Sequence, residues 1–244
     1  MKVGTITPLF KKGNKKLISN YRPVSVLPTV AKIFEKILFL QLNNYFVSNN
    51  LISKSQYGFR KNLSTVHAIQ NLLDSVFKAF ESKMPALSLH FDLAKAFDTI
   101  DHEILLGKLK LYGLNDSVMK LLSSYLSNRQ QMVKFNTPNG DVFSKICQVN
   151  AGVPQGSILG PLLFNIFIND LPKVVDYQTY LFADDTTVVL TGPDALASVK
   201  SAFSQVSYWF KVNGLKLNEQ KSQALYYTPS VLINPSSSTA KLSE

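Results

Sequence analysis

Two adjacent carboxylates, Asp184 and Asp185, lie between two short runs of apolar and β-branched residues. The runs, residues 180–181 and 186–190, flank Phe182–Asp185 and predict a β-hairpin with the carboxylates at its tip. Neighbouring negative charges repel each other, so the pair contributes little to folding on its own. A bound divalent cation would offset the repulsion, because Mg²⁺ prefers carboxylate and other oxygen ligands. A solvated turn is the alternative explanation for such a pair.

A third carboxylate, Asp92, ends another predicted strand, residues 86–92. Strand alternation places Asp92 with Ser88 and His90 on a polar, open face, opposite an apolar face. If this strand end meets the hairpin tip, Asp92 and Asp184 can bridge two Mg²⁺ ions about 3.5–4 Å apart, as in-line phosphoryl transfer requires. The carboxylates alone are also compatible with a two-metal nuclease or a nucleotidyl cyclase.

Strand alternation also ranks the two hairpin carboxylates. Tyr180, Phe182 and Asp184 share one face of the strand, whereas Asp185 points to the other face or lies at the turn. We therefore expect Asp184 to be the main metal ligand and Asp185 a secondary one.

Composition favours a folded chain with an anionic partner. The chain has 244 residues, of which 45% are hydrophobic and 17% charged, and a net charge of +10. This length allows one large domain or two modest subdomains. The positive charge favours nucleic acid, nucleotides or a membrane surface as partner, without choosing among them.

The single cysteine, Cys147, excludes an internal disulfide and a cysteine-rich zinc site. It lies in an apolar run, so we expect a buried thiol. No signal-peptide pattern is visible, and the longest apolar run, residues 158–168, is far shorter than the ~20 residues of a membrane span. We expect no membrane partner.

Strands and helices alternate along the chain and one hairpin is antiparallel, which predicts the α+β class. Residues 1–27 are expected to be loop with short extended pieces, and residues 228–244 a disordered tail. The apolar stripe of the first helix is expected to consist of Val30, Ile33, Phe34, Ile37, Leu38 and Leu42. The helices and strands that we expect are helices over 28–47, 64–81, 101–111, 116–126, 161–169 and 193–212, and strands over 86–92, 130–136, 142–149 and within 215–227.

Several sequence blocks, in this order, resemble the reverse transcriptases of non-LTR (LINE-like) retrotransposons. The resemblance covers nearly the whole chain, and the blocks that carry it are Asn20–Ser25, Gln56–Arg60, Phe91–His102, Ala151–Leu162, Phe182–Asp185, and Asn213–Asn218 with Lys221. One departure is Phe182, where the family often has tyrosine; the aromatic ring is retained.

The resemblance implies a right-hand polymerase that copies RNA into DNA. It would have fingers over 1–85 plus part of 113–150, and a palm mainly over 86–227 with an antiparallel sheet packed on helices. In the family an endonuclease usually precedes this region and a helical thumb follows it. We expect the thumb to be absent here, so the chain resembles a truncated or decayed copy.

The resemblance also implies the roles of single residues. Asp92, Asp184 and Asp185 would be catalytic and bind two Mg²⁺ ions, for which Mn²⁺ may substitute. Phe97 would be the steric gate against a ribose 2′-OH, and Gln155 and Gly156 would contact the incoming nucleotide or the template. Lys11 (or Lys12) and Arg22 would bind the triphosphate, and Lys221 would protonate the leaving pyrophosphate. Nucleic acid would be contacted by Arg60, Lys61, Tyr180 and Phe182.

Structural explanations stay open for many of these residues. Phe97 can be a core residue, the 152–157 loop a generic turn, and Lys11, Arg22 and Lys221 solvated cations. Asp98 and Asp101 are expected to be helix caps rather than ligands. His67, His90 and His102 are expected to be structural or surface residues, and Trp209 and Phe210 core residues.

The partners that we expect are an RNA template, a DNA primer and deoxynucleoside triphosphates, with nucleus or cytoplasm as the compartment. The alternative function is a catalytically inactive remnant that only binds RNA or RNA–DNA. The sequence leaves the oligomeric state open.

Overall fold

The computed structural model describes residues 2–229 and 239–241. The chain forms two compact units, the first from residues 1–51 and 97–167, the second from 52–96 and 168–244. Helices and strands mix in both units, which confirms the α+β class. The fingers over 1–85 and the palm over 86–227 stay predictions, since these two units are defined by packing alone.

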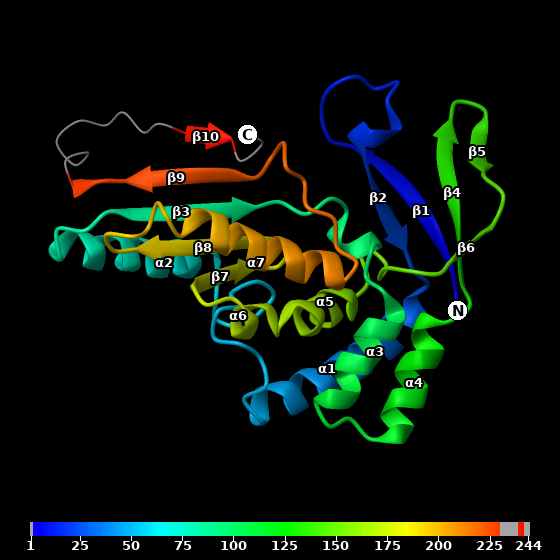
Figure 1. Ribbon diagram of the computed structural model, residues 1–244. Helices are drawn as coiled ribbons and strands as arrows, with labels where there is room; N and C mark the ends of the chain where they lie inside the picture. Colours follow the sequence, from blue (N-terminus) through cyan, green and yellow to red (C-terminus); the bar gives the residue numbers. More distant parts are fainter. Residues whose placement is uncertain (1, 230–238, 242–244) are drawn as a thin grey trace. The chain divides into compact units, whose positions relative to one another are not determined.

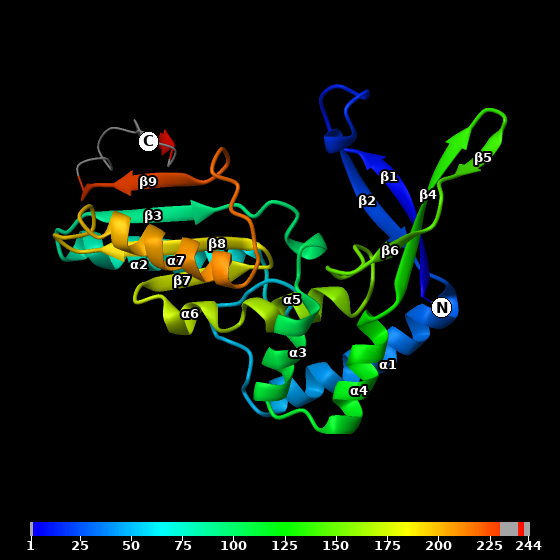
Figure 2. The ribbon, with the colours of Figure 1, turned by 45° about the vertical axis from the view of Figure 1, so that its right-hand side comes forward.

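The first unit contains a mixed sheet. Its strands are β1 (Val3–Phe10), β2 (Tyr21–Val26), β4 (Arg129–Thr137), β5 (Gly140–Phe143) and β6 (Cys147–Val149). The order is β2-β1-β4-β5, with β6 also on β4, and only the β1–β4 pairing is parallel. Figure 2 shows the β1–β2 and β4–β5 hairpins extending from this shared pairing.

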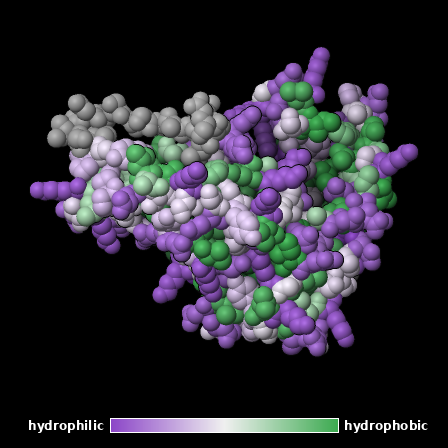
Figure 3. Space-filling view, viewed as in Figure 1, coloured by the Kyte–Doolittle hydropathy of each residue, from purple (hydrophilic) through white to green (hydrophobic). Residues whose placement is uncertain are grey.

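Two expectations for this sheet are corrected. Residues 1–27 are not mainly loop, because β1 and β2 form a long hairpin that also pairs with the distant β4. Cys147 is exposed rather than buried, because none of the three residues of β6 is buried. Figure 3 shows hydrophobic side chains at the surface over the β4–β5 hairpin, where Phe135, Val142 and Phe143 are all more than half exposed.

Side-chain caps at Asp101 and Asn115 begin two of the helices of the first unit. The helices of this unit are α1 (Thr29–Ser48), α3 (His102–Leu111), α4 (Asp116–Leu126) and α5 (Gly160–Ile168), the last of which ends at the boundary between the units. Asp101 Oδ1 accepts the backbone N–H groups of Glu103 and Ile104, and Asn115 Oδ1 accepts that of Val118. These contacts confirm the predicted cap at Asp101.

The buried face of α1 was predicted only in part. Leu38 and Leu42 are buried, but Val30, Ile33, Phe34 and Ile37 are exposed. The side of α1 that is buried instead includes a charged residue; its members are Ala31, Glu35, Leu38, Leu42 and Phe46.

The second unit is an antiparallel sheet between helices. Its strands are β3 (Ala86–Phe91), β7 (Gln178–Phe182), β8 (Asp185–Thr191), β9 (Gln223–Tyr227) and β10 (Thr239–Lys241), in the order β10-β9-β3-β8-β7. Its helices are α2 (Thr65–Glu81), α6 (Leu171–Val174) and α7 (Val199–Val212). Ala86 packs against Val76 of α2, while Phe91 contacts Phe203 and Phe210 of α7. Since Ala86 and Phe91 point to opposite faces of β3, the two helices cover opposite faces of the sheet (Figure 1).

Two boundaries in this unit are also corrected. The helix expected from Pro193 begins at Val199, because residues 192–198 form turns and Leu196 is exposed. Most of the expected disordered tail lies outside the described residues, but within it Thr239–Lys241 pairs with β9.

Trp209 and Phe210 are buried, as expected of core residues. No helix among the described residues combines the length and the hydrophobicity needed to cross a bilayer.

Candidate active site

The acidic hairpin tip is a two-residue turn. Phe182 pairs with Asp185, so Ala183 and Asp184 connect β7 to β8, as the sequence predicted. Ala183 has a φ of 56°, in the left-handed region, which costs a non-glycine residue about 1–2 kcal/mol. This conformation therefore needs support from its surroundings.

The segment 55–58 supports the turn from behind. Gln56 Oε1 accepts the backbone N–H groups of Gly58 at 2.7 Å and Ala183 at 3.1 Å. Tyr57 N–H donates to the Leu181 carbonyl, and Leu181 N–H donates to the carbonyl of Ser55. The resemblance included Gln56–Arg60 among the family blocks but implied no such role for Gln56.

Asp92 reaches the same end of the sheet. Phe91 pairs with Thr186, and continuing this register by one residue places Asp92 opposite Asp185. On the other side, Asn218 N–H donates to the Asp92 carbonyl, and Lys221 Nζ lies 3.6 Å from Asp92 Oδ2. The chain segment after α7 thus lies beside the carboxylate end of β3.

The charges of the three carboxylates interact. Loss of water contact raises the pKa of the Asp185 carboxyl, and the negative charges of Asp184 and Asp92 raise it further. The strand register places Asp92 opposite Asp185, and Asp184 precedes Asp185 in the turn, so the three residues lie at the same end of the sheet, as the two-metal hypothesis requires. The ranking of Asp184 above Asp185 stays a prediction.

The fit of a divalent cation can be judged from the groups present. Among the described residues, no three His, Cys, Asp or Glu side chains form a group that could hold a metal ion by themselves. Mg²⁺, however, usually binds one or two carboxylates together with water and substrate phosphates. Asp92 Oδ2 is buried without a hydrogen-bond partner in the described part of the chain, and its contact with Lys221 is too long for a hydrogen bond. Such an oxygen, beside two more carboxylates, fits a cation completed by substrate.

The glycine-rich loop at 152–157 lies in the first unit. Gly152 has a φ of +80°, and a Cβ there would lie 2.6 Å from the Asp98 carbonyl oxygen. Gln155 Nε2 donates to Asp98 Oδ1 at 2.9 Å, so Asp98 receives this amide rather than acting as the expected helix cap. Gly156 has a φ of +102° and faces the Ser25 carbonyl. The loop is therefore built into its surroundings and is more than a generic turn.

Phe97 is attached to the same loop. Its carbonyl accepts the Val153 N–H at 2.8 Å, and its half-buried ring stacks on Phe164 with 4.7 Å between centroids. Packing thus explains its orientation, and the steric-gate role stays a prediction.

A buried network fixes the far end of the loop, and the sequence did not reveal it. Glu35 of α1 accepts the Tyr125 hydroxyl of α4 at 2.6 Å and the Ile158 N–H at 2.7 Å. The Arg129 guanidinium lies 5.1 Å from the centre of the Tyr125 ring. Burial raises the pKa of the Tyr125 hydroxyl, and the Glu35 charge raises it further. A carboxylate on α1 thereby joins two helices to the loop.

The remaining predicted site residues differ in accessibility. Lys11 and Arg22 are exposed on the β1–β2 hairpin, and Lys61 is exposed after the 55–58 segment. One nitrogen of the Arg60 guanidinium, Nη1, already donates hydrogen bonds to the Ser53 and Gln56 carbonyls. The expected nucleic-acid roles of Arg60, Lys61 and the half-buried Phe182 stay predictions.

Tyr180 requires a correction. It is 6% exposed, and its hydroxyl bonds to Ser75 Oγ and to the Asn71 carbonyl of α2. Its ring and hydroxyl are used in packing, so the expected contact with nucleic acid is not supported.

The three histidines make structural contacts, as expected. His67 Nδ1 accepts the Ser64 backbone N–H at the start of α2, and His102 Nε2 bonds to the Gly152 carbonyl. His90 bonds to Ser88 and Thr187, so the polar face of β3 is filled rather than open.

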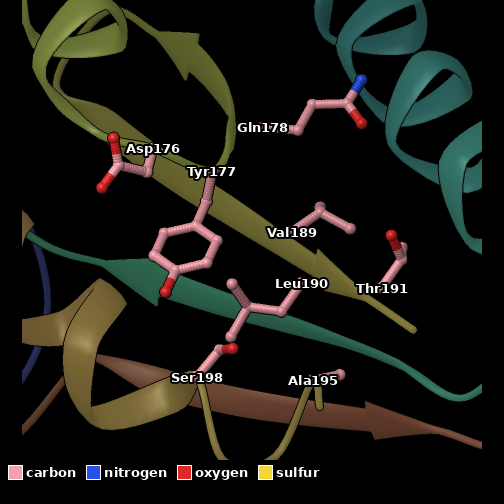
Figure 4. Close-up of a pocket in the computed structure, with 8 residues that line it drawn as sticks. All are labelled: Asp176, Tyr177, Gln178, Val189, Leu190, Thr191, Ala195 and Ser198. Carbon is pink, nitrogen blue, oxygen red and sulfur yellow. The ribbon is translucent and has the colours of Figure 1, made fainter. Parts of the chain in front are cut away.

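A pocket of about 200 Å³ lies at the opposite end of the second unit's sheet from Asp185. Figure 4 shows it between the start of β7 at Gln178 and the end of β8 at Thr191. Its acidic residue, Asp176, is bound to Gln205 through both its carboxylate and its N–H. The pocket is therefore separate from the carboxylate cluster.

Comparison with known proteins identifies the family. Residues 10–240 match the family model described as "Reverse transcriptase (RNA-dependent DNA polymerase)". This chain belongs to the reverse transcriptase family. The domain is 31% identical over 237 residues to a probable RNA-directed DNA polymerase from transposon X-element of Drosophila melanogaster, covering 93% of the chain and 25% of that protein. It is 29% identical to the RNA-directed DNA polymerase from mobile element jockey of Drosophila funebris, covering 95% of the chain and 27% of that protein.

The fold is similar to that of solved telomerases. A telomerase from Candida tropicalis, in complex with a fragment of telomeric RNA, matches with a TM-score of 0.64 at 14% identity over 92% of this chain and 41% of that one. The apo telomerase matches with a TM-score of 0.61 at 14% identity, over 100% of this chain and 49% of that one. The telomerase matches confirm the expected fingers-and-palm fold, and the family model with the transposon relatives confirms the resemblance to the reverse transcriptases of non-LTR elements. The reverse transcriptase domain spans about a quarter of the length of its transposon relatives.

Proposed function

We propose that this domain carries the catalytic residues of an RNA-directed DNA polymerase that extends the 3′-OH of a primer along an RNA template. The observation that carries the proposal is the convergence of Asp92, Asp184 and Asp185 at one end of a sheet in a reverse transcriptase chain.

The three carboxylates would hold the divalent cations that reverse transcriptases use, Mg²⁺ or Mn²⁺. Two bound cations stabilise the attacking and leaving oxygens of an in-line displacement. Lys221 Nζ, 3.6 Å from Asp92 Oδ2, holds a positive charge and transferable protons beside the same carboxylate. We assign Lys221 to the leaving pyrophosphate.

Residues of the first unit would bind the deoxynucleoside triphosphate. Arg22 offers a planar guanidinium and Lys11 a point charge, and both are exposed, so either can meet phosphate oxygens. The Phe97 ring would exclude a ribose 2′-OH. Gln155 and Gly156, anchored to Asp98 and Ser25, would contact the nucleotide or the template backbone.

The nucleic acids would be held largely through charge. The net charge of +10 favours a polyanion, and Arg60, Lys61 and Phe182 are the proposed contacts in the second unit. The compartment, nucleus or cytoplasm, stays a prediction of the family resemblance.

Primer extension on an RNA template tests the proposal. We expect incorporation that depends on Mg²⁺ and is lost in Asp184→Asn, whereas Asp194→Asn, an exposed carboxylate of the same unit, keeps the wild-type rate. Unchanged extension by Asp184→Asn would remove this carboxylate from the mechanism. Salt-sensitive RNA binding without any extension would identify an inactive nucleic-acid binder instead.

A further inference from the structure

We propose that Gln56 is a positioning residue for the acidic turn, holding Ala183 from behind and so fixing where the Asp184 and Asp185 carboxylates stand. The inference rests on the proposed function, because it concerns the same carboxylates. It assigns a role to a side chain that does not itself meet substrate or metal.

The orientation of the Gln56 amide follows from its donors. Gln56 is 0% exposed, and one end of its amide meets two backbone N–H groups, those of Gly58 and Ala183. Only the oxygen can accept from both, so the amide cannot be flipped. Its Nε2 is buried and has no hydrogen-bond partner among the described residues. The useful atom of this side chain is therefore Oε1, which faces the turn.

The turn needs an acceptor at this position. Ala183 has a φ of 56°, which an alanine rarely adopts unless its surroundings hold it there. Gln56 Oε1 provides that hold by bonding the Ala183 N–H. Because Asp184 and Asp185 follow directly in the chain, the direction of both carboxylates depends on this backbone.

The support behind the turn is tightly packed. A Cβ added at Gly58 would lie 2.3 Å from the Ala183 nitrogen, so the 55–58 backbone touches the turn directly. Arg60 Nη1 bonds to the Ser53 and Gln56 carbonyls at 3.1 and 3.0 Å and thereby holds the segment in shape. Because the 55–58 segment is held rigidly, Gln56 Oε1 fixes the position of the Ala183 backbone.

The affinity for a divalent cation should depend on the positions of the Asp184 and Asp185 carboxylates. Metal ligands must stand within about 0.2 Å of their ideal distances, and loss of a hydrogen bond that orients a ligand weakens metal affinity by about 10- to 100-fold. Replacing Gln56 with Met keeps the size of the side chain but removes the oxygen that accepts from the Gly58 and Ala183 N–H groups.

The first test is Mn²⁺ binding to the whole chain, measured by the paramagnetic resonance signal of the free ion. We expect Gln56→Met to bind Mn²⁺ at least about tenfold more weakly than wild type. The matched control, Gln178→Met, removes a glutamine at the far end of the same hairpin and should leave the affinity unchanged. Equal affinities in Gln56→Met and wild type would overturn the inference. If wild type neither binds Mn²⁺ nor extends a primer, the proposed function fails instead, and the second test alone decides the role of Gln56.

The second test needs neither metal nor activity. We expect slow hydrogen exchange at the Ala183 amide of the metal-free wild type and faster exchange in Gln56→Met. If the variant does not fold, the wild-type measurement decides alone, because an Ala183 amide that exchanges at the rate of an unstructured peptide would show that Gln56 does not hold it.

Discussion

Breaking the Glu35–Tyr125 hydrogen bond should destabilise the first unit by a measurable and specific amount. Tyr125→Phe removes the hydroxyl that donates to Glu35 Oε1 at 2.6 Å, while the Ile158 N–H still binds the other carboxylate oxygen. Glu35 is 2% exposed, so water cannot replace the lost donor without structural change. Hydrogen bonds to charged groups contribute about 1.5–3 kcal/mol. We expect the free energy of unfolding to fall by that amount.

Urea unfolding measures this loss directly. With an m-value of about 2 kcal/mol/M, the midpoint should fall by about 1 M. A double-mutant cycle with Glu35→Gln separates the pair from its surroundings, and we expect a coupling of at least about 1 kcal/mol. Tyr208→Phe, an exposed tyrosine of the other unit, is the control and should change stability by less than about 0.5 kcal/mol. A coupling near zero would refute the view that Glu35 joins the helices to the loop through Tyr125.

Gly152→Ala should lower the free energy of unfolding by at least about 2 kcal/mol, because Gly152 has a φ of +80° and lies against the Asp98 carbonyl. The control, Gly107→Ala, changes a helical glycine with open space around it and should raise the free energy of unfolding by about 0.5–1 kcal/mol. Equal thermal shifts in the two variants would reject this reasoning. Phe97→Val should admit ribonucleotides in primer extension, and unchanged discrimination between deoxy- and ribonucleotides would rule out the steric gate. Asp101→Ala should cost about 1 kcal/mol in chemical unfolding, since two backbone N–H groups lose their acceptor, and a change below 0.3 kcal/mol would contradict the importance of this cap.

Features with short-range causes could be predicted from the sequence. The acidic hairpin tip follows from two β-branched runs that flank Asp184 and Asp185, and the cap at Asp101 follows from the residue type at a helix start. The resemblance supplied the fingers-and-palm fold, which neither periodicity nor composition specifies.

Features that depend on distant partners could not be predicted. The buried side of α1 contains Glu35, because Tyr125 and the Ile158 N–H, both far along the chain, supply its hydrogen bonds. The role of Gln56 likewise depends on a backbone group at Ala183. Apolar periodicity cannot identify such positions, since it assigns charged and amide side chains to the surface.

The most direct test of the metal site is anomalous diffraction from crystals grown with Mn²⁺ and a deoxynucleoside triphosphate. We predict Mn²⁺ peaks within about 2.5 Å of carboxylate oxygens of both Asp92 and the Asp184–Asp185 turn. Peaks that touch only one of these two chain segments, or none, would contradict a cation site shared between them.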